Sequence, residues 1–119
     1  MTMNETPILD DAVLAELRES TGGDDDFVRE LVEAYVSEAT GYLTAMAAAV
    51  TDPAAIVRPA HTLKSSSATL GAMRLAAISR DIEEAGRAGR VDGLAADVSQ
   101  AHATWTETLA ALTAAGLAS

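Results

Sequence analysis

The chain has two histidines, and one of them stands in a stretch of small polar residues that favours a helix. This stretch, AHTLKSSSATLGA at residues 60–72, places Lys64 one helical turn after His61. Neutral imidazole is a nucleophile near pH 7, and a nearby ammonium group balances the negative charge that a modified ring acquires. His61 is therefore a candidate nucleophile. The same spacing occurs in many ordinary exposed helices, so it does not decide the matter alone.

Few side chains in this sequence could support other kinds of catalysis or bind a metal. There is no cysteine, which excludes disulfides, thiolate metal sites and cysteine nucleophiles. His61 and His102 are the only histidines, and no group of His, Asp and Glu has the spacing of metal ligands. We therefore expect neither a bound metal nor a cofactor. His102 lies beside an apolar stripe that includes Trp105 and Leu109, which predicts a half-buried residue at the edge of the core.

His61 is predicted to face away from the core. The apolar stripe of its helix has five positions at three- and four-residue spacing: Ile56, Ala60, Leu63, Ser67 and Leu70. At about 100° per residue, His61 lies roughly 140° from the middle of this stripe. Val57 and Ser65, one turn away, and Ala68, two turns away, have short side chains, which leaves an open surface for another protein to approach.

Five segments have the apolar periodicity of amphipathic helices. They span about residues 8–21, 24–50, 52–70, 72–88 and 93–114, with Asp10 and Asp52 as N-caps. Pro59 either bends the third helix or marks where its regular part begins. Residues 115–119 are expected to fray. The pattern predicts an all-α fold, an antiparallel four-helix bundle with an additional short N-terminal helix that covers one end.

Length and charge limit the remaining functions. The chain suits a single domain over residues 1–119, with an ordered core at about 8–115. A net charge of −10 argues against nucleic acid as a partner, although residues 53–91 carry six basic residues against three acidic ones. This basic segment favours a phosphoryl group or an acidic partner, or it is a solvated surface. With no secretory leader or membrane-spanning run in the sequence, we expect a cytoplasmic monomer that does not bind membranes.

Residues 60–72 resemble the signature of histidine-containing phosphotransfer (HPt) domains, commonly A-H-x-L-K-G/S-S-x-x-x-L-G-A. The acidic, Phe-containing segment GGDDDFVRELVEAYV and the later IEEAGRAG resemble segments that flank this signature, so the resemblance covers most of residues 8–115. It implies a four-helix bundle whose exposed histidine, His61, is reversibly phosphorylated in a multistep His-Asp phosphorelay.

The resemblance also implies partners and roles for individual residues. Family members exchange the phosphoryl group with an aspartate of a response-regulator receiver domain, which supplies Mg²⁺, and a hybrid histidine kinase is a further partner. Lys64 would balance the negative charge that the ring gains with the phosphoryl group. Glu83, where some members carry Gln, would orient the ring of His61 through its inner nitrogen; otherwise it is a solvated helix residue. The partner would dock around Val57, Arg58, Ser65 and Ala68.

Two functions remain open from the sequence. The first is phosphotransfer at His61 by a carrier without kinase activity of its own, because the chain has no glycine-rich nucleotide loop and is too short for an additional ATPase domain. The second is a noncatalytic helical adaptor or docking bundle in signalling. The adaptor predicts that His61→Gln leaves partner binding intact and that no acid-labile phosphate forms on the protein.

Overall fold

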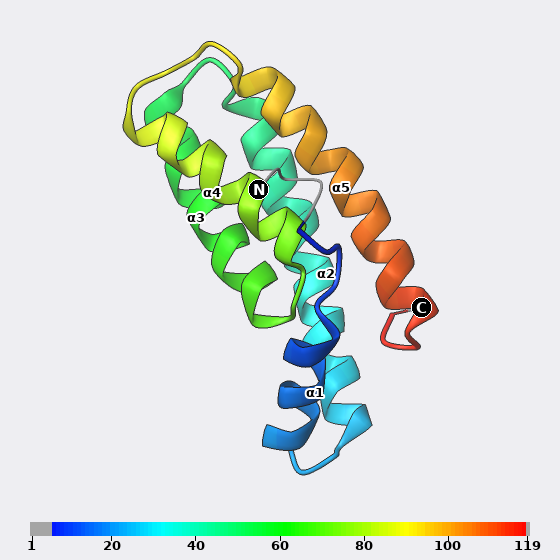
Figure 1. Cartoon of the computed structure of the whole chain (residues 1–119). Coiled ribbons are helices and arrows are strands. Elements are labelled where there is room, and N and C mark those ends of the chain that lie inside the picture. Colours follow the sequence, from blue (N-terminus) through cyan, green and yellow to red (C-terminus); the bar gives the residue numbers. More distant parts are fainter. Residues whose placement is uncertain (1–5, 119) are drawn as a thin grey trace.

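The computed structural model describes residues 6–118, and within this range the chain forms helices and no strand (Figure 1). The helices are α1 (Asp11–Ser20), α2 (Asp25–Ala48), α3 (Pro53–Thr69), α4 (Met73–Arg87) and α5 (Leu94–Ala114). The predicted all-α fold is confirmed, and every helix begins and ends within about three residues of the expected position. The outermost parts of the expected domain, residues 1–5 and 119, lie outside the described residues.

Aspartate side chains begin three of the helices. Asp10, Asp24 and Asp52 each accept a hydrogen bond from a backbone N–H group in the first turn of α1, α2 and α3, respectively. A carboxylate there satisfies a free N–H group and is favoured by the helix dipole. The predicted N-caps Asp10 and Asp52 are thus confirmed. Helix α3 begins at Pro53 and continues through Pro59, so Pro59 is not the start of the helix.

Helices α2 to α5 pack in a closed ring in which α2 contacts α3, α3 contacts α4, α4 contacts α5 and α5 contacts α2. Figure 1 shows α3 and α4 side by side, with α5 running along α2. Helix α1 contacts α2 near the N-terminal end of α2, beyond the ends of α3 and α4. The arrangement is the predicted four-helix bundle with a short first helix at one end.

The apolar stripe of α3 is buried as its periodicity predicts. Ile56, Ala60 and Leu63 are inaccessible to solvent, and Leu70 just after the helix is also buried. Ser67 is the polar member of this stripe, and its Oγ lies 2.7 Å from the hydroxyl oxygen of Tyr35 on α2. This hydrogen bond offsets the cost of burying a serine hydroxyl. The side chains of α3 therefore determine which face of this helix points into the core.

The buried face of α5 agrees with the predicted stripe at Leu94, Val98, Ala101 and Leu112, and it differs at Trp105 and Leu109. Thr104 and Thr108 are buried, whereas Trp105 is only half-buried. Thr108 tolerates burial because its Oγ1 donates a hydrogen bond of 2.7 Å to the carbonyl oxygen of Thr104. This phase leaves His102 roughly 100° from the middle of the buried face. His102 is accordingly exposed, with Nδ1 3.0 Å from the carbonyl oxygen of Val98, and the prediction of a half-buried residue is wrong.

The segment after α5 packs against the bundle. Gly116 has a φ of 76°, and its N–H group donates to the carbonyl oxygen of Thr113. The N–H group of Leu117 donates to the carbonyl oxygen of Leu112 at 2.9 Å. These two bonds form a Schellman motif, which turns Leu117 back into the core, where it is 3% exposed. The expected fraying of residues 115–118 is therefore wrong; Ser119 lies outside the described residues.

The turn between α3 and α4 requires glycine at position 71. Gly71 has a φ of 81°, a conformation that side chains disfavour. A Cβ atom there would also lie 3.0 Å from the carbonyl oxygen of Asp10. The carbonyl oxygen of Gly71 in turn accepts a hydrogen bond of 2.8 Å from the N–H group of Asp10. The turn that ends the histidine helix is thus tied to the residue that caps α1.

Helices α3 and α4 pack closely at Gly86. A Cβ atom on Gly86 would lie 2.8 Å from the carbonyl oxygen of Pro53 and 2.9 Å from the Cγ2 atoms of Ile56 and Val57. The backbones therefore pack together without an intervening side chain. This approach fixes the separation of the two helices that carry the charged residues described below.

We expect Gly86→Ala to destabilise the bundle by about 1–3 kcal/mol, because the added methyl group overlaps backbone and side-chain atoms. Gly41→Ala is the matched control. Gly41 also lies within a helix, α2, but a Cβ atom there would meet nothing within 4 Å. Alanine should therefore stabilise that position by about 0.5–1 kcal/mol. Urea unfolding measures the change in the free energy of unfolding of each variant. An equal change in the two variants would contradict the close approach at Gly86.

Candidate functional site

The imidazole of His61 lies on the outside of α3. Its side chain is 53% exposed, whereas Ala60 and Leu63 on the same helix are fully buried. This orientation agrees with the angle predicted from the apolar stripe. The ring is therefore open to a reactant that arrives from solvent.

Glu83 on α4 joins the charged groups around His61. Its carboxylate Oε2 lies 2.8 Å from Nδ1 of His61, and its Oε1 lies 2.7 Å from Nζ of Lys64. The guanidinium of Arg87, one turn further along α4, contacts Oε2 through Nη2 at 2.7 Å and through Nε at 3.2 Å. The Glu83 side chain is only 6% exposed. The alternative that Glu83 is a solvated helix residue is therefore wrong.

The basic neighbours keep the buried carboxylate of Glu83 ionised. The hydrogen bond from Lys64 lowers the pKa of Glu83 most, and the hydrogen bonds from Arg87 and His61 lower it further. Burial acts in the opposite direction but is outweighed, so the pKa falls from 4.5 to about 2. At neutral pH the site thus contains a negative charge beside the ring, paired with the cationic side chains of Lys64 and Arg87.

An ionised carboxylate also fixes where the hydrogen of the neutral imidazole lies. Glu83 has no hydrogen to donate, so the 2.8 Å contact requires the hydrogen on Nδ1 of His61. The other ring nitrogen, Nε2, then carries the lone pair. A base that holds Nδ1–H in this way raises the nucleophilicity of Nε2. The geometry is that of a neutral imidazole prepared to attack an electrophile in solution.

Comparison with known proteins assigns the chain to a family. The family model of the Hpt domain matches residues 30–115, a range that includes His61, Lys64, Glu83 and Arg87. The chain belongs to the Hpt domain family. No curated protein sequence matches it. As an Hpt domain, it is a histidine phosphotransfer module of phosphorelays, a phosphoryl carrier of a class that is not itself a kinase.

A solved structure has the same fold as this Hpt domain. It is the crystal structure of histidine-containing phosphotransfer protein B (HptB) from Pseudomonas aeruginosa PAO1, with a TM-score of 0.79 and 29% sequence identity. The match covers 87% of this chain and 90% of the HptB chain. The resemblance found in the sequence is thus confirmed for the family and for the helical bundle.

The Hpt domain family interacts with receiver domains and histidine kinases. None of the helices in residues 6–118 combines the length and the apolarity needed to cross a bilayer. In the same residues, no group of three or more His, Cys, Asp or Glu side chains is arranged to hold a metal ion.

The candidate docking residues of the Hpt domain lie around His61 on α3. Arg58 and Ser65 are exposed, and Val57 and Ala68 are half-buried. Their placement is compatible with the docking role that the resemblance implies, which remains a prediction. The ammonium group of Lys64 contacts α4 through Glu83, with 2.7 Å between Nζ and Oε1.

Arg87 was missed by the sequence reasoning as a site residue. It counted only as one member of the basic segment, although its position four residues after Glu83 predicts a contact along one helix face. That spacing was the available signal. The contact of Arg87 with the oxygen that also holds His61 is not predictable from α4 alone, because it requires the packing of α3 against α4.

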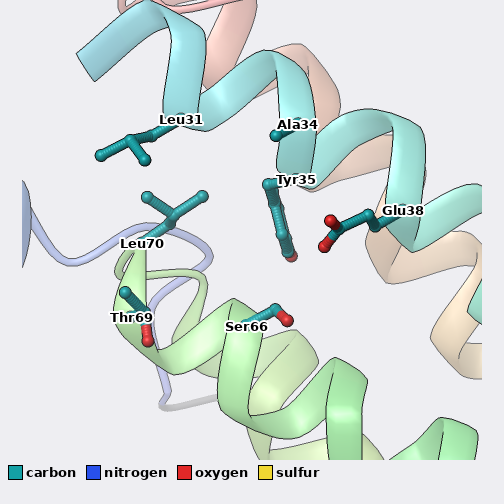
Figure 2. A pocket seen from close by; sticks show the side chains of 7 residues that line it. All are labelled: Leu31, Ala34, Tyr35, Glu38, Ser66, Thr69 and Leu70. Carbon is teal, nitrogen blue, oxygen red and sulfur yellow. The ribbon is translucent and has the colours of Figure 1, made fainter. Parts of the chain in front are cut away.

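The Hpt domain also has an open groove between α2 and α3, with a volume of about 320 Å³. It is lined by Leu31, Ala34, Tyr35, Glu38, Ser66, Thr69 and Leu70. Figure 2 shows the side chains of Leu31 and Leu70 facing each other across this groove, with Glu38 further along α2. Burial raises the pKa of Tyr35 to about 12, so its hydroxyl stays protonated beside Ser67. The sequence analysis did not predict this groove.

The charge of Glu83 predicts a specific dependence of stability on pH. Because folding lowers the pKa of Glu83 from 4.5 to about 2, its stabilising contribution is complete above pH 4.5 and is lost as the pH falls toward 2. We expect the free energy of unfolding of the wild type to exceed that of Glu83→Gln at pH 7, with a gap that narrows below pH 4.5. Urea unfolding between pH 3 and pH 7 measures the gap. Glu84→Gln, an exposed neighbour, is the control, and a gap that is constant with pH would contradict the charged site.

Proposed function

We infer that this Hpt domain accepts a phosphoryl group on Nε2 of His61 and returns it to aspartates of response-regulator receiver domains. The observation that carries this proposal is the contact between Nδ1 of the exposed His61 and the ionised, buried carboxylate of Glu83. It supports Nε2 as the nucleophile. The family membership supports phosphorus as the electrophile.

The transfer needs no proton movement within the Hpt domain. The lone pair of Nε2 attacks the phosphorus of the aspartyl phosphate, the Nε2–P bond forms, and the P–O bond breaks with its electrons leaving on the aspartate carboxylate. Nδ1 keeps its hydrogen throughout. Catalysis on this side consists of positioning and charge balance, while Mg²⁺ on the receiver would stabilise the phosphoryl oxygens.

Lys64 is proposed to balance the charge of the incoming phosphoryl group. Its side chain is 32% exposed and lies one turn from His61, and its ammonium group already holds Glu83 at 2.7 Å. An ammonium group has three hydrogens and can donate to Glu83 and to a phosphoryl oxygen together. Lys64 thus links the carboxylate under the ring to the face that the receiver approaches.

The receiver is proposed to dock on α3 around His61, at Val57, Arg58, Ser65 and Ala68. The short side chains at positions 65 and 68 permit close approach of the aspartyl phosphate. The groove between α2 and α3 would extend this surface, since Thr69 on its rim lies eight residues, or about 12 Å, along the helix from His61. A standard interface of about 800 Å² per partner spans that distance. The same face would meet a hybrid histidine kinase.

The test is to incubate the purified protein with several phosphorylated receiver domains, and separately with phosphoramidate, and to measure intact mass and the labelled residue. The proposal predicts one added phosphate, stable in alkali and labile in acid, on the peptide that contains His61. His102 is the internal control, because it is also exposed but lies on α5 with Nδ1 held by a backbone carbonyl group. Absence of label from a folded protein with every donor would favour the adaptor instead.

A further inference from the structure

We propose that the charge on Glu83 sets the equilibrium of phosphoryl transfer in favour of His61, and that Arg87 opposes it by competing for the same carboxylate oxygen. The proposal rests on the proposed function and adds a thermodynamic role to two residues. It treats Glu83 and Arg87 as positioning residues, because neither forms nor breaks a bond in the reaction.

The charge of the ring changes when it is phosphorylated. The form of the unmodified ring that attacks phosphorus is a neutral imidazole, with hydrogen on Nδ1 and a lone pair on Nε2. Once Nε2 forms its bond to phosphorus and the aspartate carboxylate departs, Nδ1 retains its hydrogen and the ring carries a positive charge. The Nδ1–H group then donates to Glu83 as a cation. The carboxylate of Glu83 is ionised in both states, so phosphorylation adds the attraction between this negative charge and the new positive charge of the ring, and Glu83 stabilises the phosphorylated ring more than the free ring.

Arg87 reduces this preference because of where it binds. Its Nη2 atom lies 2.7 Å and its Nε atom 3.2 Å from Oε2, the same oxygen that is 2.8 Å from Nδ1 of His61. Two cations on one oxygen repel each other, so the guanidinium disfavours the positive ring. Lys64, by contrast, occupies the other oxygen, Oε1. Arg87, like His61, is exposed, with 61% of its side chain accessible.

The equilibrium constant is the appropriate measurement. A catalyst, or a change in how tightly the receiver docks, alters the forward and reverse rates equally and leaves the equilibrium between the free proteins unchanged. Only a difference in stability between the phosphorylated and free forms of this protein can move it. A variant with a merely structural role would change rates or folding, but not this constant.

The experiment uses the full chain and one receiver domain that labels the wild type. The two proteins are mixed from both directions, and their phosphorylated fractions are measured at equilibrium on acrylamide gels that retain the phosphoprotein. We expect Glu83→Gln to lower the constant for transfer onto His61 about fivefold. We expect Arg87→Gln, which keeps a hydrogen-bond donor but removes the charge, to raise it about twofold.

Matched variants control for net charge. Glu84→Gln makes the same change as Glu83→Gln at an exposed neighbouring position. Arg80→Gln makes the same change as Arg87→Gln on the same face of α4, two turns earlier, where the arginine pairs with Asp81 instead. Both controls should leave the constant at the wild-type value, and thermal melts establish that each variant is folded.

Each outcome decides between the alternatives. Opposite shifts in Glu83→Gln and Arg87→Gln, with neither control moving, support the proposal. An unchanged or raised equilibrium constant in Glu83→Gln overturns the proposal. An unchanged or lowered constant in Arg87→Gln also overturns it. Because the Arg87 side chain is exposed, the Arg87→Gln test remains valid even if Glu83→Gln does not fold. A lowered constant in Arg87→Gln would mean that the guanidinium contacts the phosphoryl group. If no receiver labels wild-type His61, the proposed function fails, which is a separate result.

Discussion

Replacing His61 by glutamine is expected to abolish phosphate acceptance completely while the bundle remains folded. Glutamine has no nucleophilic ring nitrogen, so no Nε2–P bond can form. The fold should tolerate the change because the His61 side chain is 53% exposed and lies off the buried stripe of α3. Only the contact with Glu83 is altered, a cost of about 1 kcal/mol or less, since Lys64 and Arg87 still hold that carboxylate.

Intact mass after incubation with a phosphorylated receiver measures the loss, and thermal unfolding by circular dichroism measures the stability. His102→Gln is the matched control, as it removes the other histidine from an exposed position on α5. That variant should accept phosphate like the wild type. Label on His61→Gln would assign the acceptor to another residue. A melting temperature lowered by 10 °C or more would contradict the exposed position of the ring.

Replacing Leu63 by aspartate is expected to have the largest effect on stability. Leu63 is fully buried in the core stripe of α3, two positions after the histidine. The substitution removes an apolar side chain and introduces a carboxylate that has no buried partner, which together cost about 4 kcal/mol or more. A domain of this size has a total stability of about 5–15 kcal/mol, so a large part of it would be lost.

Ser65→Asp is the control for Leu63→Asp, because it introduces the same charge two residues further along the same helix at an exposed position. It should change the free energy of unfolding by about 0.5 kcal/mol or less. Urea titration of both variants tests the phase of α3. Similar midpoints for the two variants would show that the helix does not present Leu63 to the core and His61 to solvent.

The sequence predicts α3 well because its buried positions are mostly strongly apolar and evenly spaced. Ile56, Leu63 and Leu70 define one face, and the exposure of His61 follows from that face without any knowledge of the other helices. Helix α5 is less predictable. Its Ala and Thr residues differ little in apolarity, so the period alone does not distinguish Thr104 from Trp105 as the buried residue.

The charged site is only partly predictable for a different reason. The sequence places His61 and Lys64 on one helix turn, but the two helices of the site meet through packing that no single-helix pattern describes. The close approach at Gly86 brings α4 against α3, which buries Glu83 between them. The resemblance to a family supplied the pairing of His61 with Glu83. It did not supply Arg87, whose role depends on sharing one oxygen with the ring.

The position of the site within one pair of adjacent helices has a consequence for how it assembles. His61 and Glu83 are 22 residues apart in the chain, and all four residues of the site, His61, Lys64, Glu83 and Arg87, belong to the hairpin of α3 and α4. Closing so short a loop costs little chain entropy. Partial opening of the bundle at α1 or at the end of α5 therefore leaves these contacts in place. The chemistry of the histidine should survive fluctuations that expose other parts of the core.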